Sequence, residues 1–294
     1  MDPLGLLWIF FILASLQPAV ERFVLLMRRR RSLEEIARAR GATVITLIHR
    51  QETMSFLGFP IVRYIDIDDA ESVLRAIRST PKGQPIEIVL HTPGGLVLAT
   101  RQIAAALADH DGQVTAVVPH YAMSGGTMIA LAADEIVLDP HAALGPVDPQ
   151  LGQQPAASIL AAVEVPQRHD DATLILADVA RKAIAQVEGF VTRLLEPRLG
   201  REQAADVARL LATGTWTHDH PLLASELETL GLPVRIGVDE EERELMALYP
   251  QPRGRQPAVE YVPGAPERPT LPRRRETPRP ERPRRRAKTS VIER

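Results

Sequence analysis

The chain has 294 residues, with 35 Lys and Arg against 37 Asp and Glu, so its overall charge points to no particular class of partner. Hydrophobic residues make up 45% of the sequence, which is enough for a buried core and excludes a wholly disordered protein. The absence of cysteine excludes disulfides, thiolate metal sites and a cysteine nucleophile.

The first region is apolar. Residues 3–20 carry no charge, and four arginines follow at 28–31. At about 1.5 Å per helical residue, such a run is close to the shortest helix that spans a bilayer. Positive charge follows the apolar run, which is not the order of a secretory signal peptide and places the rest of the chain in the cytoplasm. We therefore predict a membrane anchor over 1–27 that contacts lipid, in a single-pass protein of the cell membrane. The alternative is a buried or interfacial helix, given Pro18 inside the run.

A basic linker is predicted over 28–42, followed by a globular domain over 43–249. Within this domain, runs rich in Val and Ile alternate with helical patterns, which favours an α/β fold with parallel strands. A helix is predicted to follow Asp68, with Asp68 as its cap and Glu71 completing a capping box. Strands are predicted at TVITLIH (43–49), IVRYIDI (61–67), IEIVLH (86–91), VTAVVP (114–119) and EIVLD (135–139).

The last region, 250–294, is rich in arginine and proline and nearly lacks apolar residues. Such a composition cannot bury enough surface to offset the entropy of ordering, so we predict disorder. A basic tail can bind nucleic acid or anionic lipid. We favour a solvated extension and predict no specific nucleic-acid partner.

Two glycine turns follow predicted strands. The first is His91-Thr92-Pro93-Gly94-Gly95, where paired glycines allow a sharp turn with exposed N–H groups. Such donors hold an oxyanion or a phosphate, although many strand-to-helix turns contain the same residues.

The second turn is Tyr121-Ala122-Met123-Ser124-Gly125-Gly126, which places a serine at the start of a helix. An ordinary N-cap serine is the structural alternative to a nucleophile. The turn is not the G-x-S-x-G elbow of α/β-hydrolases, because Ala122 occupies the first glycine position. Parallel pairing would bring both turns to the same carboxyl edge, where they would supply a serine and two donors for acyl transfer.

The blocks HTPGGLVLATRQIAAAL and VPHYAMSGGTMIALAADEIVLDPHAALGPVDPQ resemble the Clp-fold serine peptidases. The nearest branch is the serine dehydrogenase proteinase (SDH-type) family, which is related to signal peptide peptidase A. The resemblance runs from HRQETMSFLGFP at 49–60 to GTWTHDHPLLASELETLGL at 214–232. It implies a ClpP/crotonase-like spiral of ββα units, a polypeptide substrate, no cofactor, and assembly into a homo-oligomer. It also implies Ser124 as nucleophile, with an oxyanion hole formed by the N–H groups of Gly95 and Gly125.

The residue that activates Ser124 is open among three possibilities. ClpP has a histidine after the serine, and His141 lies roughly where that residue is expected. Signal peptide peptidase A uses a lysine further along the chain, and Lys182 follows Ser124 by 58 residues. The SDH-type family has also been described with a serine, aspartate, histidine order, for which the candidates here are Asp148 or Asp171, then His218 or His220.

We favour Lys182 as the base, and hence a Ser-Lys dyad, from its place on a long helical pattern. Lys182 shares a stripe with Ile175, Val179 and Phe190, which predicts a packed surface where desolvation would depress its pKa. Arginine could not replace it, because a guanidinium does not deprotonate in proteins. The chain has only three lysines among its basic residues, so a lysine rather than an arginine at position 182 favours a need for its chemistry.

The pair His218 and His220 flanks an aspartate, but such a short motif without further ligand spacing does not predict a metal site. The predicted function is thus a membrane-anchored serine endopeptidase. The alternatives are a catalytically silent Clp-fold scaffold at the membrane and a crotonase-type acyl-CoA enzyme.

Overall fold

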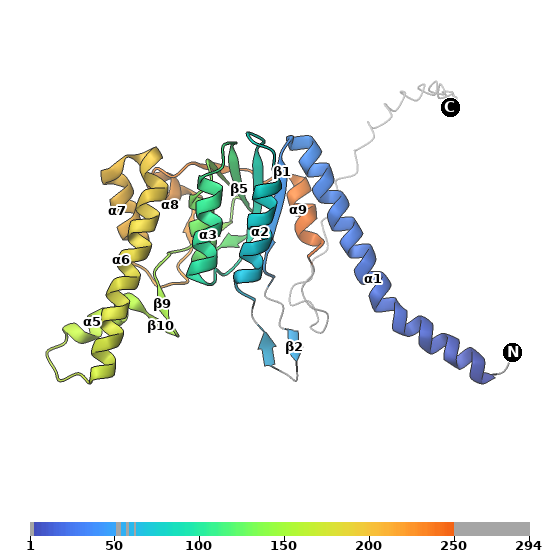
Figure 1. Ribbon diagram of the computed structural model, residues 1–294, viewed down its shortest axis with the longest axis horizontal. Helices are drawn as coiled ribbons and strands as arrows, with labels where there is room; N and C mark the ends of the chain where they lie inside the picture. The colour runs from blue at the N-terminus through green and yellow to red at the C-terminus, as the bar shows by residue number, and fades with distance from the viewer. Residues whose placement is uncertain (1–2, 51–53, 57–58, 62, 250–294) are drawn as a thin grey trace, which may run out of the picture. The chain divides into compact units, whose positions relative to one another are not determined.

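A computed structural model describes residues 3–50, 54–56, 59–61 and 63–249 of the chain, with side chains described from residue 16 onward except at 51–62. The predicted disordered tail over 250–294 lies outside the described residues. The chain forms an α/β structure around a parallel sheet, consistent with a ClpP-like fold (Figure 1).

The central sheet has five strands in the order β1-β4-β5-β7-β12, and each neighbouring pair is parallel. The register matches His91 at the end of β4 with Ile48 at the end of β1. The strands of this sheet are β1 (Thr43–Ile48), β4 (Ile86–His91), β5 (Val114–Val118), β7 (Glu135–Leu138) and β12 (Val234–Ile236).

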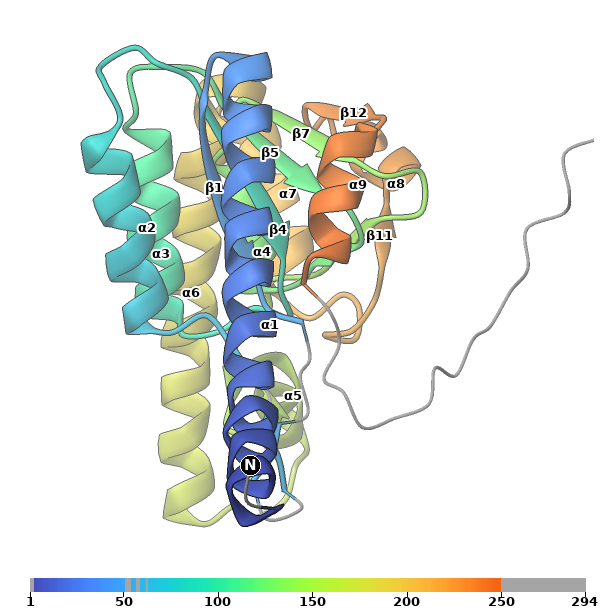
Figure 2. The same ribbon diagram turned by 90° about the vertical axis from the view of Figure 1, so that its right-hand side faces the viewer.

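Helices cover both faces of the sheet, because side chains of successive strand residues point to opposite faces. On one face, Ile86, Ile88 and Leu90 pack in a core with residues of the first set of helices, namely α2 (Ile67–Ser79), α3 (Val97–Ala108), α4 (Gly125–Leu131), α6 (Asp171–Leu199), α7 (Arg201–Ala212) and α8 (Ala224–Thr229). On the other face, Val89 and Val117 pack with α1 (Pro3–Arg40) and α9 (Glu240–Ala247), which lie beside each other in Figure 2.

Four of the five predicted strands are confirmed as β1, β4, β5 and β7. The predicted strand over 61–67 is wrong, because Asp66 caps α2 and the helix begins at Ile67. The predicted cap at Asp68 is also wrong: Asp66 and Asp69 form the capping box, each side chain accepting a backbone N–H of the other. Of the rest of the predicted strand, Ile61 ends the short strand 59–61, and Ile65 forms an isolated parallel bridge with Gly95.

A smaller sheet lies beside the central one and has the order β11-β8-β6. Its strands are β6 (Tyr121–Ala122), β8 (Ala143–Leu144) and β11 (Leu222–Leu223). Two further hairpins are formed by β2 (Met54–Phe56) with β3 (Phe59–Ile61), and by β9 (Gln150–Leu151) with β10 (Gln154–Pro155).

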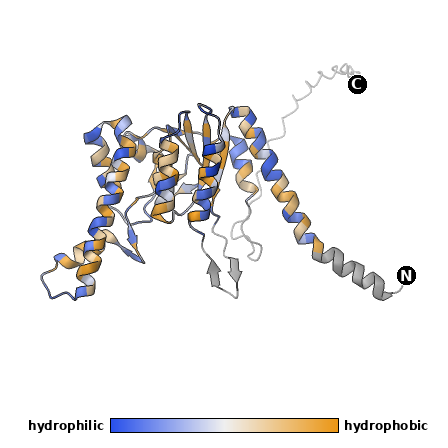
Figure 3. Ribbon diagram, in the orientation of Figure 1, coloured by the Kyte–Doolittle hydropathy of each residue, from blue (hydrophilic) through white to orange (hydrophobic). Residues whose placement is uncertain are grey.

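The helices α5 (Ala156–Glu164) and α6 form a hairpin that projects from the sheet (Figure 1). Ala156, Ile159, Ala177 and Ala180 form a small core inside this hairpin, separate from the main one. Hydrophobic and hydrophilic residues alternate along α6 in Figure 3. The projecting part of the hairpin thus depends on its own packing, whereas the C-terminal half of α6 packs in the main core.

The predicted membrane anchor and membrane localisation require correction. No helix within the described residues is long and apolar enough to cross a bilayer. Among the described side chains of α1, which begin at residue 16, Glu21, Arg22 and the arginines at 28–31 interrupt the apolar residues, so no apolar stretch of about 20 residues remains. Near its C-terminal end, Ile36 is 2% exposed and packs against the sheet.

Candidate active site

Ser124 lies in the turn between β6 and α4, immediately before the first residue of the helix. Its φ of 51° makes it the one non-glycine residue with positive φ in the described ranges. Such a backbone conformation costs of order 1–3 kcal/mol and persists only where the surroundings impose it, often at functional sites. The side chain makes no cap hydrogen bond, so this serine does not act as an ordinary N-cap.

Glycines allow the two turns to approach each other closely. A Cβ on Gly94 would lie 2.8 Å from the Cβ of Ser124, and a Cβ on Gly125 would lie 2.5 Å from Thr100 Oγ1. A Cβ on Gly95 would lie 2.3 Å from the backbone of Ile65. Side chains at these positions would therefore force the turns apart.

The N–H groups of Gly95 and Gly125 lie near each other beside Ser124. The Cβ position of Gly125 is only 3.4 Å from Gly95 N. Within the described residues, neither N–H donates to a protein acceptor. Two free donors beside a partly exposed hydroxyl are the arrangement that stabilises a tetrahedral oxyanion.

Thr92 holds the two turns together. Its N–H donates to Tyr121 O at 3.3 Å, and its carbonyl accepts from Met123 N at 2.9 Å. The side chain of Thr92 is fully buried, and its Oγ1 accepts from Gly94 N at 3.2 Å. The relative position of the oxyanion donors and Ser124 thus depends on one residue.

Asp148 and His218 form a pair in which the carboxylate is buried and the imidazole is 32% exposed. Asp148 is 2% exposed, and its Oδ1 lies 2.8 Å from His218 Nδ1. The other carboxylate oxygen accepts from Gln150 Nε2 at 2.7 Å. The pair assigns the proton of the imidazole to Nδ1 and leaves Nε2 as an acceptor, which is the tautomer that a general base requires.

The smaller sheet brings this pair to the same end as Ser124. Strand β8 pairs parallel with β6 and antiparallel with β11, and Leu144 takes part in both pairings. Ser124 comes two residues after β6, Asp148 four residues after β8, and His218 four residues before β11. Since β11 is antiparallel, all three residues lie beyond one end of this sheet.

Lys182 lies elsewhere. Its side chain is 68% exposed and pairs with Asp178 one turn earlier on α6. Ile175 and Val179, predicted to lie with it on a packed stripe, are 66% and 43% exposed. Phe190, further along α6, packs on α3. Lys182 lies eight residues before Phe190, which is about 12 Å along the helix. In a single copy of the chain, the Lys182 side chain is therefore exposed to solvent rather than packed.

The other predicted candidates are less suited to catalysis in this structure. His220 stacks on Trp216 at 5.3 Å between ring centroids, and its Nε2 is buried without a hydrogen-bond partner among the described residues. His141 is exposed after β7, and Asp171 is exposed in the first turn of α6. No group of three or more His, Asp or Glu side chains in the described ranges could hold a metal ion.

An open groove of about 540 Å³ begins two residues after Gly95. It is lined by Val97, Leu98, Arg101, Gln102, Ala105 and Phe190, and the Arg101 guanidinium lies 4.8 Å from the centre of the Phe190 ring.

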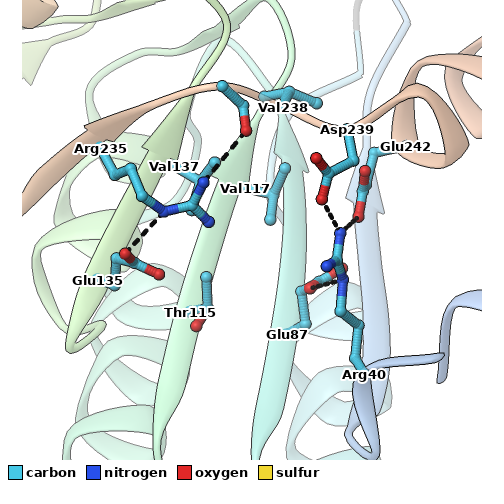
Figure 4. A pocket seen from close by; sticks show the side chains of 11 residues that line it. Arg40, Glu87, Thr115, Val117, Glu135, Val137, Arg235, Val238, Asp239 and Glu242 are labelled. Carbon is cyan, nitrogen blue, oxygen red and sulfur yellow. Dashed lines mark hydrogen bonds and ion pairs between the residues drawn. The ribbon is translucent and has the colours of Figure 1, made fainter. Parts of the chain in front are cut away.

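A second cavity, of about 150 Å³, lies on the sheet face that α1 and α9 cover (Figure 4). There Arg40 pairs with Glu87, Asp239 and Glu242. Burial, followed by the neighbouring Glu242, raises the pKa of Glu87 to about 7. No serine or histidine lines this cavity, so we assign it a structural role.

Sequence reasoning assigned no role to Thr92 or His49, although both are buried at the carboxyl edge of the sheet. The available signal was their position at strand ends, since His49 is the last residue of the strand predicted over 43–49 and Thr92 directly follows the one predicted over 86–91. Their side-chain hydrogen bonds, which connect His49 to Thr92 and to Asp69, join segments far apart in the sequence.

The sequence model of the ClpP-like SDH-type serine proteinases matches residues 2–274. Two similar proteins from Methanocaldococcus jannaschii are both named as uncharacterized. MJ1495 is 51% identical over 257 residues, which cover 87% of this chain and 88% of that protein. MJ0137 is 49% identical over 271 residues, which cover 90% of this chain and 95% of that protein. With this match over nearly its whole length, and with a serine and two free N–H donors at one sheet edge, the chain belongs to the ClpP-like SDH-type serine proteinase family.

Proposed function

We propose that the protein is a serine endopeptidase that hydrolyses polypeptides through an acyl-enzyme on Ser124. The observation that carries this proposal is the strained turn that presents the Ser124 hydroxyl beside the unused N–H groups of Gly95 and Gly125. Membership of a serine proteinase family supports a polypeptide as substrate.

We propose His218 as the base, oriented by Asp148, in place of Lys182. Ser124 Oγ attacks the scissile carbonyl carbon, and its proton passes to His218 Nε2. Gly95 and Gly125 stabilise the oxyanion of the tetrahedral intermediate. The C–N bond then breaks, the amine leaves with the proton from His218, and an ester on Ser124 remains.

Water completes the cycle by the same route. His218 accepts a proton from the water as it attacks the ester carbonyl, and then returns that proton to Ser124 Oγ as the acid product leaves. Support for His218 comes from the buried Asp148 carboxylate, which fixes the ring without blocking Nε2.

We further propose that copies of the chain associate. Leu174, Ile175 and Val179 expose apolar surface on the projecting part of α6. Contiguous exposed apolar residues are typical of association surfaces. Sedimentation of the wild type and of an Ile175→Asp variant tests this: the proposal expects a multimer that the charge weakens, and a monomeric wild type contradicts it.

The peptidase assignment is tested with fluorescent casein and a fluorophosphonate probe. We expect casein cleavage in the wild type and none above a no-enzyme control in Ser124→Ala. Mass spectrometry of the labelled protein should find the probe on Ser124. Labelling at another serine, or cleavage by Ser124→Ala, would contradict the assignment.

A further inference from the structure

A second buried group of side chains lies at the same edge of the sheet, built around His49. His49 directly follows β1, is 6% exposed, and donates its backbone N–H to His91 O at 2.7 Å. Its ring thus lies among the turns that end β1 and β4.

Both ring nitrogens of His49 have partners. Nε2 lies 3.1 Å from Asp69 Oδ2, and Nδ1 lies 3.0 Å from Thr92 Oγ1. Asp69 belongs to the capping box of α2, where the same oxygen accepts the N–H of Asp66. The ring therefore connects the start of a helix to the residue that joins the two catalytic turns.

One arrangement of protons satisfies every group in this chain. Gly94 N–H donates to Thr92 Oγ1, the Thr92 hydroxyl donates to His49 Nδ1, and His49 Nε2–H donates to the Asp69 carboxylate. A protonated ring would instead donate from Nδ1. The Thr92 hydroxyl would then have to turn towards Gly94 O, which is 3.4 Å away.

We propose that His49 is a positioning residue of the oxyanion hole, which acts through Thr92 to fix the Gly94–Gly95 turn against Ser124. Asp69 selects the tautomer that accepts the Thr92 hydroxyl. This role rests on the proposed peptidase function, but His49 itself touches neither the nucleophile nor the substrate.

The burial of His49 favours this neutral form. Burial lowers the pKa of His49, and Arg63 lowers it further, whereas Asp69 and Asp66 oppose the change. His91, next to it on β4, also has its pKa lowered, to about 4, chiefly by burial. Both rings are therefore neutral near pH 7, as the hydrogen-bond chain requires.

The test measures how fast a fluorophosphonate labels Ser124 over a range of probe concentrations. This separates the maximal labelling rate from the probe concentration at half-maximal rate. We expect Thr92→Val and His49→Leu to lower the maximal labelling rate about tenfold or more, because the Gly95 N–H donor is then misplaced in the transition state. The probe concentration at half-maximal rate should change little. Thr92→Ser and His49→Asn, which restore a polar atom towards the partner, should recover most of the rate.

His110→Leu is the matched control. His110 also hydrogen-bonds through its ring, to Gln84 O at 2.8 Å, but in the turn that precedes β5 at the opposite edge. Its labelling rate should equal that of the wild type. If the wild type itself is not labelled, the peptidase proposal fails.

If the wild type is labelled and both apolar variants react at its rate, the positioning role is overturned. A merely structural role would lower the amount of folded protein and would not separate Thr92→Val from Thr92→Ser at equal folded concentration. Should His49→Leu fail to fold, the rate of His49→Asn against wild type and the comparison of Thr92→Val with Thr92→Ser decide the outcome: a His49→Asn rate near that of wild type beside a slow Thr92→Val supports the role, and equal rates of the two Thr92 variants overturn it.

Discussion

The smaller sheet and the α5–α6 hairpin each offer a base to Ser124, and they differ in how firmly they hold it. In the smaller sheet, backbone pairing through β8 fixes the segments of Asp148 and His218, and the carboxylate is buried. On the hairpin, Lys182 extends into solvent and pairs with Asp178, which is also exposed. A base needs a fixed position, and of the two regions only the smaller sheet holds its candidate by a hydrogen bond to a buried carboxylate.

Distance along the sequence and a helical pattern favoured Lys182, whereas the structure pairs Asp148 with His218. Lys182 has the spacing and helical pattern of a catalytic lysine, but the stripe that predicted its burial faces solvent in the single chain. The contact between Asp148 and His218 spans 70 residues and depends on a two-residue strand. Long-range pairing, rather than residue spacing, decides which candidate is held in place.

The largest effect is expected from Asp148→Asn. The amide cannot stabilise an imidazolium and favours the wrong tautomer, which should lower kcat roughly 10³- to 10⁴-fold. Casein cleavage at equal folded concentration measures this. The matched change in the hairpin, Asp178→Asn, should alter the rate less than about twofold. Equal effects of the two changes would remove the distinction between the regions.

Gly125→Ala should lower the rate about 10²-fold, because its Cβ would lie 2.5 Å from Thr100 Oγ1 and displace an oxyanion donor. Thr100 Oγ1 has no partner among the described residues, so adding Thr100→Ala should remove the clash and restore part of the rate. Gly189→Ala on α6 is the control, since its Cβ has no atom closer than 3.7 Å. Fluorophosphonate labelling rates compare the three variants.

Glu87→Gln tests a buried carboxylate that, unlike Asp148, has an oxygen without a partner among the described residues. Its pKa is raised from 4.5 to about 7, chiefly by burial, so the folded state binds its proton more tightly than the unfolded state. The stabilisation is complete below pH 4.5 and is lost as pH rises through about 7, a change of about 3 kcal/mol.

Urea unfolding at several pH values measures this dependence. Wild type should lose free energy of unfolding between pH 4.5 and 7 relative to Glu87→Gln, which has no such proton. Parallel curves for the two proteins would show that Glu87 does not titrate in this range. The expected response of casein cleavage at pH 7 is small, because the cavity lies on the other face of the sheet.

The smallest effect is expected from His141→Ala. This side chain is exposed in the turn after β7, and its backbone N–H, which the change retains, makes the bond to Asp139. The casein cleavage rate should change less than about twofold. A tenfold loss would place a histidine outside the smaller sheet in the catalytic site.

Much of the fold was predictable because strands rich in Val and Ile, such as 86–91, form the buried centre of the sheet. The strand predicted over 61–67 failed because the local cap at Asp66 outweighed the apolar pattern. The Ser124 turn and its glycines were recognised from local residues. The roles of Thr92 and His49 were not, since they arise from hydrogen bonds that connect several turns.

The most direct test compares the rate of Ser124 labelling in His218→Ala and Lys182→Met at equal folded concentration. The account predicts that His218→Ala reduces labelling at least about 10³-fold, while Lys182→Met reacts within about twofold of the wild type. Methionine keeps the length and the packing of the lysine stem but not its nitrogen. A nearly inactive Lys182→Met beside an active His218→Ala would contradict the account and assign the base to Lys182, supplied where the hairpin is covered by another copy of the chain.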